Sequence, residues 1–97
     1  MTYGLKSLPK FERQFKKFYP KEKEIIREEI NKIKSDPTIG ELKKGALANI
    51  RVHKFKVHHQ LCLLAYEQDI KWKIVYLYAI GSHENFYNVL KRYIDNI

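Results

Sequence analysis

The sequence predicts an α+β domain, in which an antiparallel β-sheet carries two N-terminal helices and a short C-terminal helix. Two stretches near the N-terminus repeat apolar residues every three or four positions, as amphipathic helices do. Apolar stretches typical of strands fill the middle of the chain, and one more helical pattern ends it. Helices that stand apart from consecutive strands favour an antiparallel sheet. A length of 97 residues fits a single domain over 1–97.

The N-terminal third is predicted to form one strand and two helices. The strand covers Thr2–Lys6, and Ser7 is the expected N-cap of the first helix. Tyr19-Pro20 separates the helices, because a residue before proline avoids helical geometry. The second helix runs from about Lys21 to Lys34. The apolar stripes are Phe11, Phe15 and Phe18 in the first helix and Ile26, Ile30 and Ile33 in the second.

Three more strands are predicted after a loop over Thr38–Asn49. They cover Ile50–Val57, Gln60–Tyr66 and Lys71–Ile80, with turns at His58-His59 and Glu67–Asp69. The apolar residues of the first of these strands change face halfway along it. We therefore expect a bulge near His53 or Lys54. Gly81 ends the last strand, and a stripe that starts at Phe86 predicts the final helix.

The charge of the chain points to an anionic partner. Nineteen Lys and Arg residues oppose eleven Asp and Glu residues, which gives a net charge of +8. Nucleic acid, an anionic membrane surface or an acidic protein would suit this balance, and a merely solvated surface is the alternative. The single cysteine, Cys62, lies in an apolar stretch and is expected to be buried and inert.

Four stretches, in this order, resemble the RelE/ParE superfamily of type II toxins. They are the linker Asp36–Leu47, the basic strand Ile50–Phe55, the strand Leu63–Tyr66 that ends in Tyr, and Ala79–Tyr87, where a strand-ending Gly precedes a basic residue and a Tyr. Many members carry an arginine just before the strand-ending Tyr, whereas this chain has no cation from Gln60 to Ala65. Arg51, Lys54 or Lys56 is then expected to supply the charge.

The resemblance implies a function as well as a fold. It implies a cytoplasmic toxin that cleaves messenger RNA on the ribosome and forms a hetero-oligomer with a cognate antitoxin. No apolar stretch approaches membrane-spanning length, so no membrane contact is predicted. Two alternatives stay open, namely a ParE-like inhibitor of DNA gyrase and a nucleic-acid-binding module without catalysis. The histidines favour the nuclease, because gyrase binding needs neither an acid nor a base.

Cleavage of RNA without a metal needs a base, an acid and cations at the phosphate. Histidine suits both proton transfers, because its unperturbed pKa is about 6.5. His83, just after the predicted strand end, is the first catalytic candidate and His53 the second. Glu84 is a weaker candidate for the base, and Tyr87 is a candidate for positioning the phosphate or stacking on a base. Helix capping, solvation and ordinary packing are the structural alternatives for these residues.

The strand over Ile50–Val57 supplies most of the candidate contacts to RNA. In a regular strand, Arg51 and His53 share one face and Lys54 and Lys56 share the other. We expect Arg51, Lys54 and Lys56 to bind phosphates, against the alternative of a solvated edge strand. His58 is a further candidate, with a solvated turn as its alternative. The four histidines match no zinc pattern, so neither a metal nor another cofactor is predicted.

Overall fold

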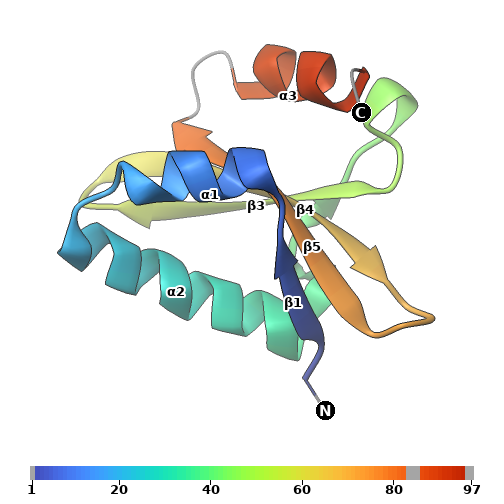
Figure 1. Ribbon diagram of the computed structural model, residues 1–97, viewed down its shortest axis with the longest axis horizontal. Coiled ribbons are helices and arrows are strands. Elements are labelled where there is room, and N and C mark those ends of the chain that lie inside the picture. The colour runs from blue at the N-terminus through green and yellow to red at the C-terminus, as the bar shows by residue number, and fades with distance from the viewer. Residues whose placement is uncertain (1, 83–85, 96–97) are drawn as a thin grey trace.

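A five-stranded sheet in the order β1-β5-β4-β3-β2 forms the centre of the computed structural model, which describes residues 2–82 and 86–95 (Figure 1). The strands are β1 (Gly4–Ser7), β2 (Glu41–Leu42), β3 (Ile50–Val57), β4 (Gln60–Asp69) and β5 (Ile74–Ser82). The helices are α1 (Pro9–Lys16), α2 (Pro20–Ser35) and α3 (Phe86–Asp95), and the linker holds two short 3-10 turns, η1 (Pro37–Ile39) and η2 (Gly45–Leu47). Strand β1 pairs with β5 in parallel, and the other neighbours pair antiparallel. The predicted α+β fold is confirmed.

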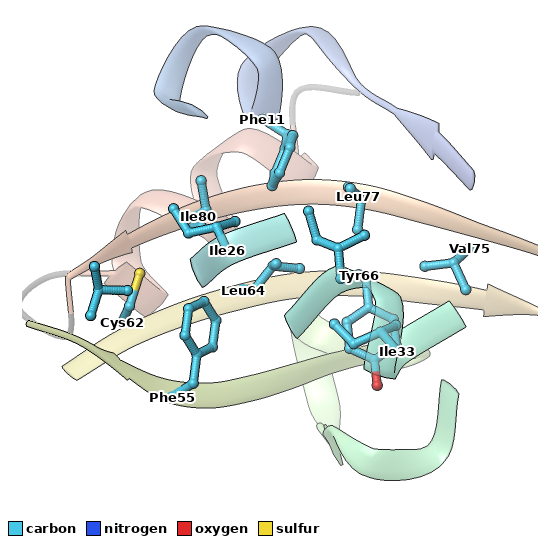
Figure 2. Packing of buried hydrophobic residues seen from close by; sticks show 12 residues of the cluster. Phe11, Ile26, Ile33, Phe55, Cys62, Leu64, Tyr66, Val75, Leu77 and Ile80 are labelled. Carbon is cyan, nitrogen blue, oxygen red and sulfur yellow. The ribbon is translucent and has the colours of Figure 1, made fainter. Parts of the chain in front are cut away.

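The first hydrophobic core lies between the sheet and the helices α1 and α2 (Figure 2). The predicted stripe of α2 is buried in it, and Phe11 enters it from α1 while Phe15 and Phe18 pack at its edge. From the sheet it receives Phe55, Val57, Cys62, Leu64, Tyr66, Val75, Leu77 and Ile80. Full burial of one large apolar side chain is worth about 1.5–3 kcal/mol, so this layer supplies much of the stability.

A second core lies on the opposite face of the sheet, under α3. Phe86 and Leu90 come from the helix and Leu47 from η2, and they pack on strand residues that include Val52 and Leu63. Helices α2 and α3 therefore lie on opposite sides of the sheet (Figure 1). Both faces of the central strands are covered, which explains why β4 is almost continuously apolar.

The two cores also explain the apolar pattern of β3, and the bulge predicted near His53 or Lys54 is wrong. Strand β3 pairs with β4 without a register shift over its whole length, from Ile50 to Val57. Its first half faces the second core and its second half faces the first. The apolar residues change face because different helices cover the two halves, and no residue is inserted.

The irregularity of the sheet lies in β5 instead. Ala65 pairs with Ala79 while Tyr66 pairs with Leu77, so Tyr78 is the extra residue of a bulge. The Tyr78 hydroxyl donates a hydrogen bond of 2.7 Å to Glu67 on β4. Beyond the bulge, Ile80 returns to the same core as Leu77.

Several predicted boundaries are also wrong, and the last strand covers Ile74–Ser82 rather than Lys71–Ile80, so Gly81 does not end it. Strand β4 continues to Asp69, so the turn lies at residues 70–73 rather than at Glu67–Asp69. Ser7 ends β1, and Leu8 is the N-cap of α1. The loop predicted over Thr38–Asn49 contains β2, which has only two residues and therefore too little alternation to be recognised.

Candidate functional site

The alternation of β3 sends its polar side chains to opposite faces of the sheet. Arg51 and His53 lie on the face of α1 and α2, and Lys54 and Lys56 lie on the face of α3. This division follows the expectation for a regular strand. The structure therefore separates the four polar residues of β3 that the sequence singled out into two pairs.

Arg51 binds the first part of the linker, between α2 and β2. One guanidinium nitrogen donates to the Gly40 carbonyl at 2.8 Å and lies 3.4 Å from the Thr38 carbonyl. Tyr66 on β4 makes hydrogen bonds to the backbone of the same part of the linker. Its buried hydroxyl donates to the Pro37 carbonyl at 2.6 Å and accepts from the Gly40 N–H at 2.9 Å. These contacts fix the path of the chain into β2 and favour a structural role for Arg51.

His53 contacts α2. Its Nε2 lies 2.7 Å from Glu29 Oε1, and its ring stacks on Phe55 with the centroids 5.4 Å apart. Burial alone would raise the pKa of Glu29, but hydrogen bonds from Lys32 and His53 outweigh burial and the pKa is lowered. The His53 side chain is only 15% exposed. These contacts favour a structural role for His53 as well.

Lys54 and Lys56 are exposed on the face of α3, at the end of the sheet where β5 finishes. Lys54 pairs with Leu63, which pairs with Gly81, so these three residues form one row across the sheet. Lys56 pairs with Leu61 in the next row. The pKa of Glu41 is lowered, mainly by its hydrogen bond to Lys43 and also by Lys54.

The turn at His58-His59 lies at the same end of the sheet. Both residues are exposed and have positive φ angles of 50° and 71°. Such angles match the favoured two-residue hairpin turn, which usually contains Gly, because it lacks a Cβ, and Asn, which tolerates a positive φ better than most residues do. The predicted turn is confirmed. It begins directly after Val57, which follows Lys56 in β3.

Tyr87 lies on α3 above the linker. Lys43 Nζ is 5.0 Å from the centroid of its ring, and Phe86 packs against it edge to face. Within residues 2–82 and 86–95, the buried Tyr87 hydroxyl has no hydrogen-bond acceptor, although it interacts with the Lys43 ammonium. His83 and Glu84 lie outside the described residues, immediately after Ser82, the last residue of β5.

Sequence reasoning missed two features of this region. One is the set of hydrogen bonds that Tyr66 makes to the linker. The other is a pocket of about 340 Å³ beside α3, lined by Lys43, Lys44, Leu47, Tyr87, Asn88 and Lys91. The adjacent lysines at 43 and 44 were the available signal, but their partner Lys91 is distant in the sequence.

A larger groove, of about 850 Å³, lies on the opposite side of the sheet between β1, α1 and α2. Its apolar lining includes Leu5, Pro9, Phe11, Phe15, Ile30 and Leu77. Its polar lining contains four cations, Arg13, Lys16, Arg27 and Lys34, and one acid, Glu12. The groove therefore suits an apolar segment with negative charge.

Among the described residues, no three His, Cys, Asp or Glu side chains gather closely enough to hold a metal ion. None of the helices in the described part of the chain has the length and hydropathy needed to cross a membrane.

Comparisons with known proteins agree with the fold. A family model described as "ParE-like toxin of type II bacterial toxin-antitoxin system" matches residues 5–91. A search of curated protein sequences gives no match. The fold is similar to that of a double mutant of the Escherichia coli toxin RelE in the free state, with a TM-score of 0.78 and 16% identity over 100% of this chain and 99% of that one.

Two toxin–antitoxin complexes contain similar chains. For the RelBE2 complex of Mycobacterium tuberculosis the TM-score is 0.75 at 15% identity, covering 86% of this chain and 100% of that one. For the archaeal RelE–RelB complex of Pyrococcus horikoshii OT3 it is 0.62 at 12% identity, covering 87% and 98%. At these identities the likeness establishes the fold alone.

Proposed function

The chain belongs to the ParE-like toxins of type II bacterial toxin–antitoxin systems, and we propose that it is a cytoplasmic endoribonuclease that cleaves messenger RNA on the ribosome. Its antitoxin holds it inactive. The net charge of +8 and the fold it shares with RelE structures support this proposal. A common fold does not fix the target, so the argument depends on the site.

The observation that carries the proposal is the exposed pair Lys54 and Lys56 on β3. These lysines lie at the end of the sheet where β5 finishes. Neighbouring strands are about 4.8 Å apart, so Lys54 and Gly81 are separated by about 10 Å across Leu63. His83 is the next residue in the sequence after Ser82, with which β5 ends. A phosphate bound by Lys54 and Lys56 is then close to the chain segment that carries a titratable histidine.

These residue types are sufficient for cleavage without a metal. A base removes the proton of the ribose 2′-OH, and the oxygen attacks the adjacent phosphorus. The bond from phosphorus to the 5′ oxygen breaks, and an acid gives that oxygen a proton. His83 performs one of the proton transfers, with Glu84 as a second candidate for the base. Lys54 and Lys56 stabilise the additional negative charge of the phosphorane.

The remaining candidates divide by their contacts. His58 is next to the row of Lys56 and serves as an RNA contact, whereas Tyr87 positions the RNA from α3. Arg51 and His53 face the other side of the sheet, where they bind the linker and α2. We assign them to the stability of the fold.

Single-turnover cleavage of mRNA in the ribosomal A site tests the nuclease. His83→Ala should lower the rate by about 100-fold or more. The double variant Lys54→Gln/Lys56→Gln should lower the rate and also the salt dependence of binding. The matched control is Lys21→Gln/Lys71→Gln, which removes two exposed lysines elsewhere and should leave the rate unchanged. A wild-type protein that cleaves no mRNA and inhibits DNA gyrase would replace this proposal with the gyrase alternative.

The groove between α1 and α2 is the proposed docking site of the antitoxin. Its apolar floor and four cations fit an acidic amphipathic helix. Arg13→Glu/Lys16→Glu should therefore weaken the complex with the antitoxin by at least about 10-fold, as measured by titration calorimetry. Lys71→Glu is the control, because Lys71 is exposed and does not line the groove. Equal affinity of the groove variant and the control would place the antitoxin elsewhere.

A further inference from the structure

We propose that the pocket beside α3 binds a second phosphate of the RNA backbone, away from the phosphate that is cleaved. This inference rests on the proposed ribonuclease function and names a further part of its RNA site. The pocket has a volume of about 340 Å³ and is built from two separate parts of the chain. Lys43, Lys44 and Leu47 come from the linker, and Tyr87, Asn88 and Lys91 come from α3.

The charge of the lining favours an anion. Three of the six lining residues are lysines, and none is an acid. Glu41 pairs with Lys43, at 2.5 Å, and neutralises one of the three positive charges. Lys44 and Lys91 are exposed. Their charges add to a local positive potential, which attracts a phosphate group.

The buried hydroxyl of Tyr87 is the second observation. Buried polar groups are almost always hydrogen-bonded, and an exception calls for a missing partner such as an ion. The Tyr87 hydroxyl interacts with the Lys43 ammonium and helps to raise the pKa of that lysine, but an ammonium cannot accept a proton, and among the described residues the hydroxyl has no acceptor. A phosphate oxygen is a strong acceptor, so a phosphate in this pocket would satisfy the hydroxyl.

Lys43 is already held in position. Its side chain is only 19% exposed, its ammonium lies over the Tyr87 ring, and its hydrogen bond to Glu41 raises its pKa. A cation that is fixed before binding loses little conformational entropy when the phosphate arrives.

The pocket lies on the same face of the sheet as Lys54 and Lys56. The Lys43 N–H donates to the Ile50 carbonyl at 2.9 Å, and Lys54 follows Ile50 by four residues, or about 13 Å along the strand. Glu41 contacts Lys43 and lies close enough to Lys54 for that lysine to lower its pKa. One single-stranded RNA could therefore contact the lysine pair and the pocket together.

This placement favours RNA over an acidic segment of the antitoxin. The groove proposed for the antitoxin is on the other side of the sheet, between α1 and α2. The pocket is smaller than the groove, half of its lining residues are lysines, and Leu47 is its one apolar lining residue besides the aromatic ring of Tyr87. It suits a compact anion better than the apolar face of a helix.

The test measures binding of an RNA oligonucleotide made uncleavable by 2′-O-methylation, so that loss of catalysis does not affect the result. Lys44→Gln/Lys91→Gln should weaken binding by about 10-fold and reduce the slope of log K against log salt by about 0.7, the value for one lost phosphate contact. Lys21→Gln/Lys71→Gln removes the same charge from exposed positions outside the pocket and should change neither quantity.

Tyr87→Phe supplies a second test that a merely structural role would not pass. It should weaken RNA binding by about 5-fold without lowering the Tm of the RNA-free protein, because the hydroxyl that it removes has no acceptor there.

Three results would overturn the inference. In the first, the pocket and control variants lose equal affinity for RNA while wild-type cleavage persists, which leaves the proposed function intact. In the second, the pocket variant keeps its RNA affinity and loses affinity for the antitoxin, which assigns the pocket to that protein. In the third, the wild-type protein neither binds nor cleaves RNA, and the proposed function fails as well.

Discussion

Replacement of Tyr66 by Phe should destabilise the protein by about 2–4 kcal/mol. The hydroxyl is the hydrogen-bond partner of two buried backbone groups, the Pro37 carbonyl at 2.6 Å and the Gly40 N–H at 2.9 Å. Each buried group left without a partner costs about 1–2 kcal/mol, and the phenyl ring itself keeps its packing. A domain of this size is stable by about 5–10 kcal/mol in total, so the loss is easy to detect.

Urea unfolding followed by circular dichroism measures the effect of Tyr66→Phe. The midpoint should fall while the slope m stays constant, because the surface exposed on unfolding does not change. Tyr19→Phe is the matched control, since Tyr19 is 75% exposed and its loss should cost less than about 0.5 kcal/mol. A loss below about 0.5 kcal/mol for Tyr66→Phe would show that water replaces the hydroxyl and would refute this account of the linker.

Three more predictions concern the same sheet. His53→Ala should lower the free energy of unfolding by about 1–2 kcal/mol, because Glu29 loses a partner; the cleavage rate should stay near wild type, and a large loss of rate would return His53 to catalysis. His58→Asn/His59→Gly should raise the unfolding midpoint in urea by relieving two positive φ angles, a gain of about 1–2 kcal/mol; unchanged stability would mean that the turn is not strained. Burial raises the pKa of Cys62 from 9.0 to about 11. The folded protein therefore favours the neutral thiol. The contribution of Cys62 to the free energy of unfolding is complete below pH 9 and is lost as the pH rises towards 11. From pH 8 to pH 10, wild type should lose about 1.4 kcal/mol more than Cys62→Ala, and parallel losses would contradict the assignment.

The sequence predicted the helices well and the details of the strands poorly. The stripe of Ile26, Ile30 and Ile33 packs on one surface only, the sheet, so its burial follows from the helical period alone. It is buried as predicted. The pattern of β3 was misinterpreted because a strand between two helical layers can turn apolar residues to either face. No local signal in the sequence shows where the helical layer on one face ends and the layer on the other face begins. The change of face in β3 therefore resembled a bulge.

The candidate site was predictable to the extent that it depends on alternation. The separation of Arg51 and His53 from Lys54 and Lys56 needs only the two-residue period of a strand. The partners of these side chains were not predictable, because they come from other elements. Glu29 is 24 residues from His53, and Gly40 is 26 residues from Tyr66. Such contacts are set by the packing of α2 and the linker on the sheet.

The position of a residue in β3 therefore indicates which property its substitution will change. Odd-numbered positions from Arg51 to Val57 face α2 and the linker, and their side chains bind backbone carbonyls, Glu29 or the first core. The even positions Lys54 and Lys56 are exposed on the face of α3. The charges of Lys54 and Lys56 therefore lie on a surface where a polyanion can offset their repulsion, while the opposite face keeps the strand in place. A single strand can serve both needs because its two faces have different neighbours.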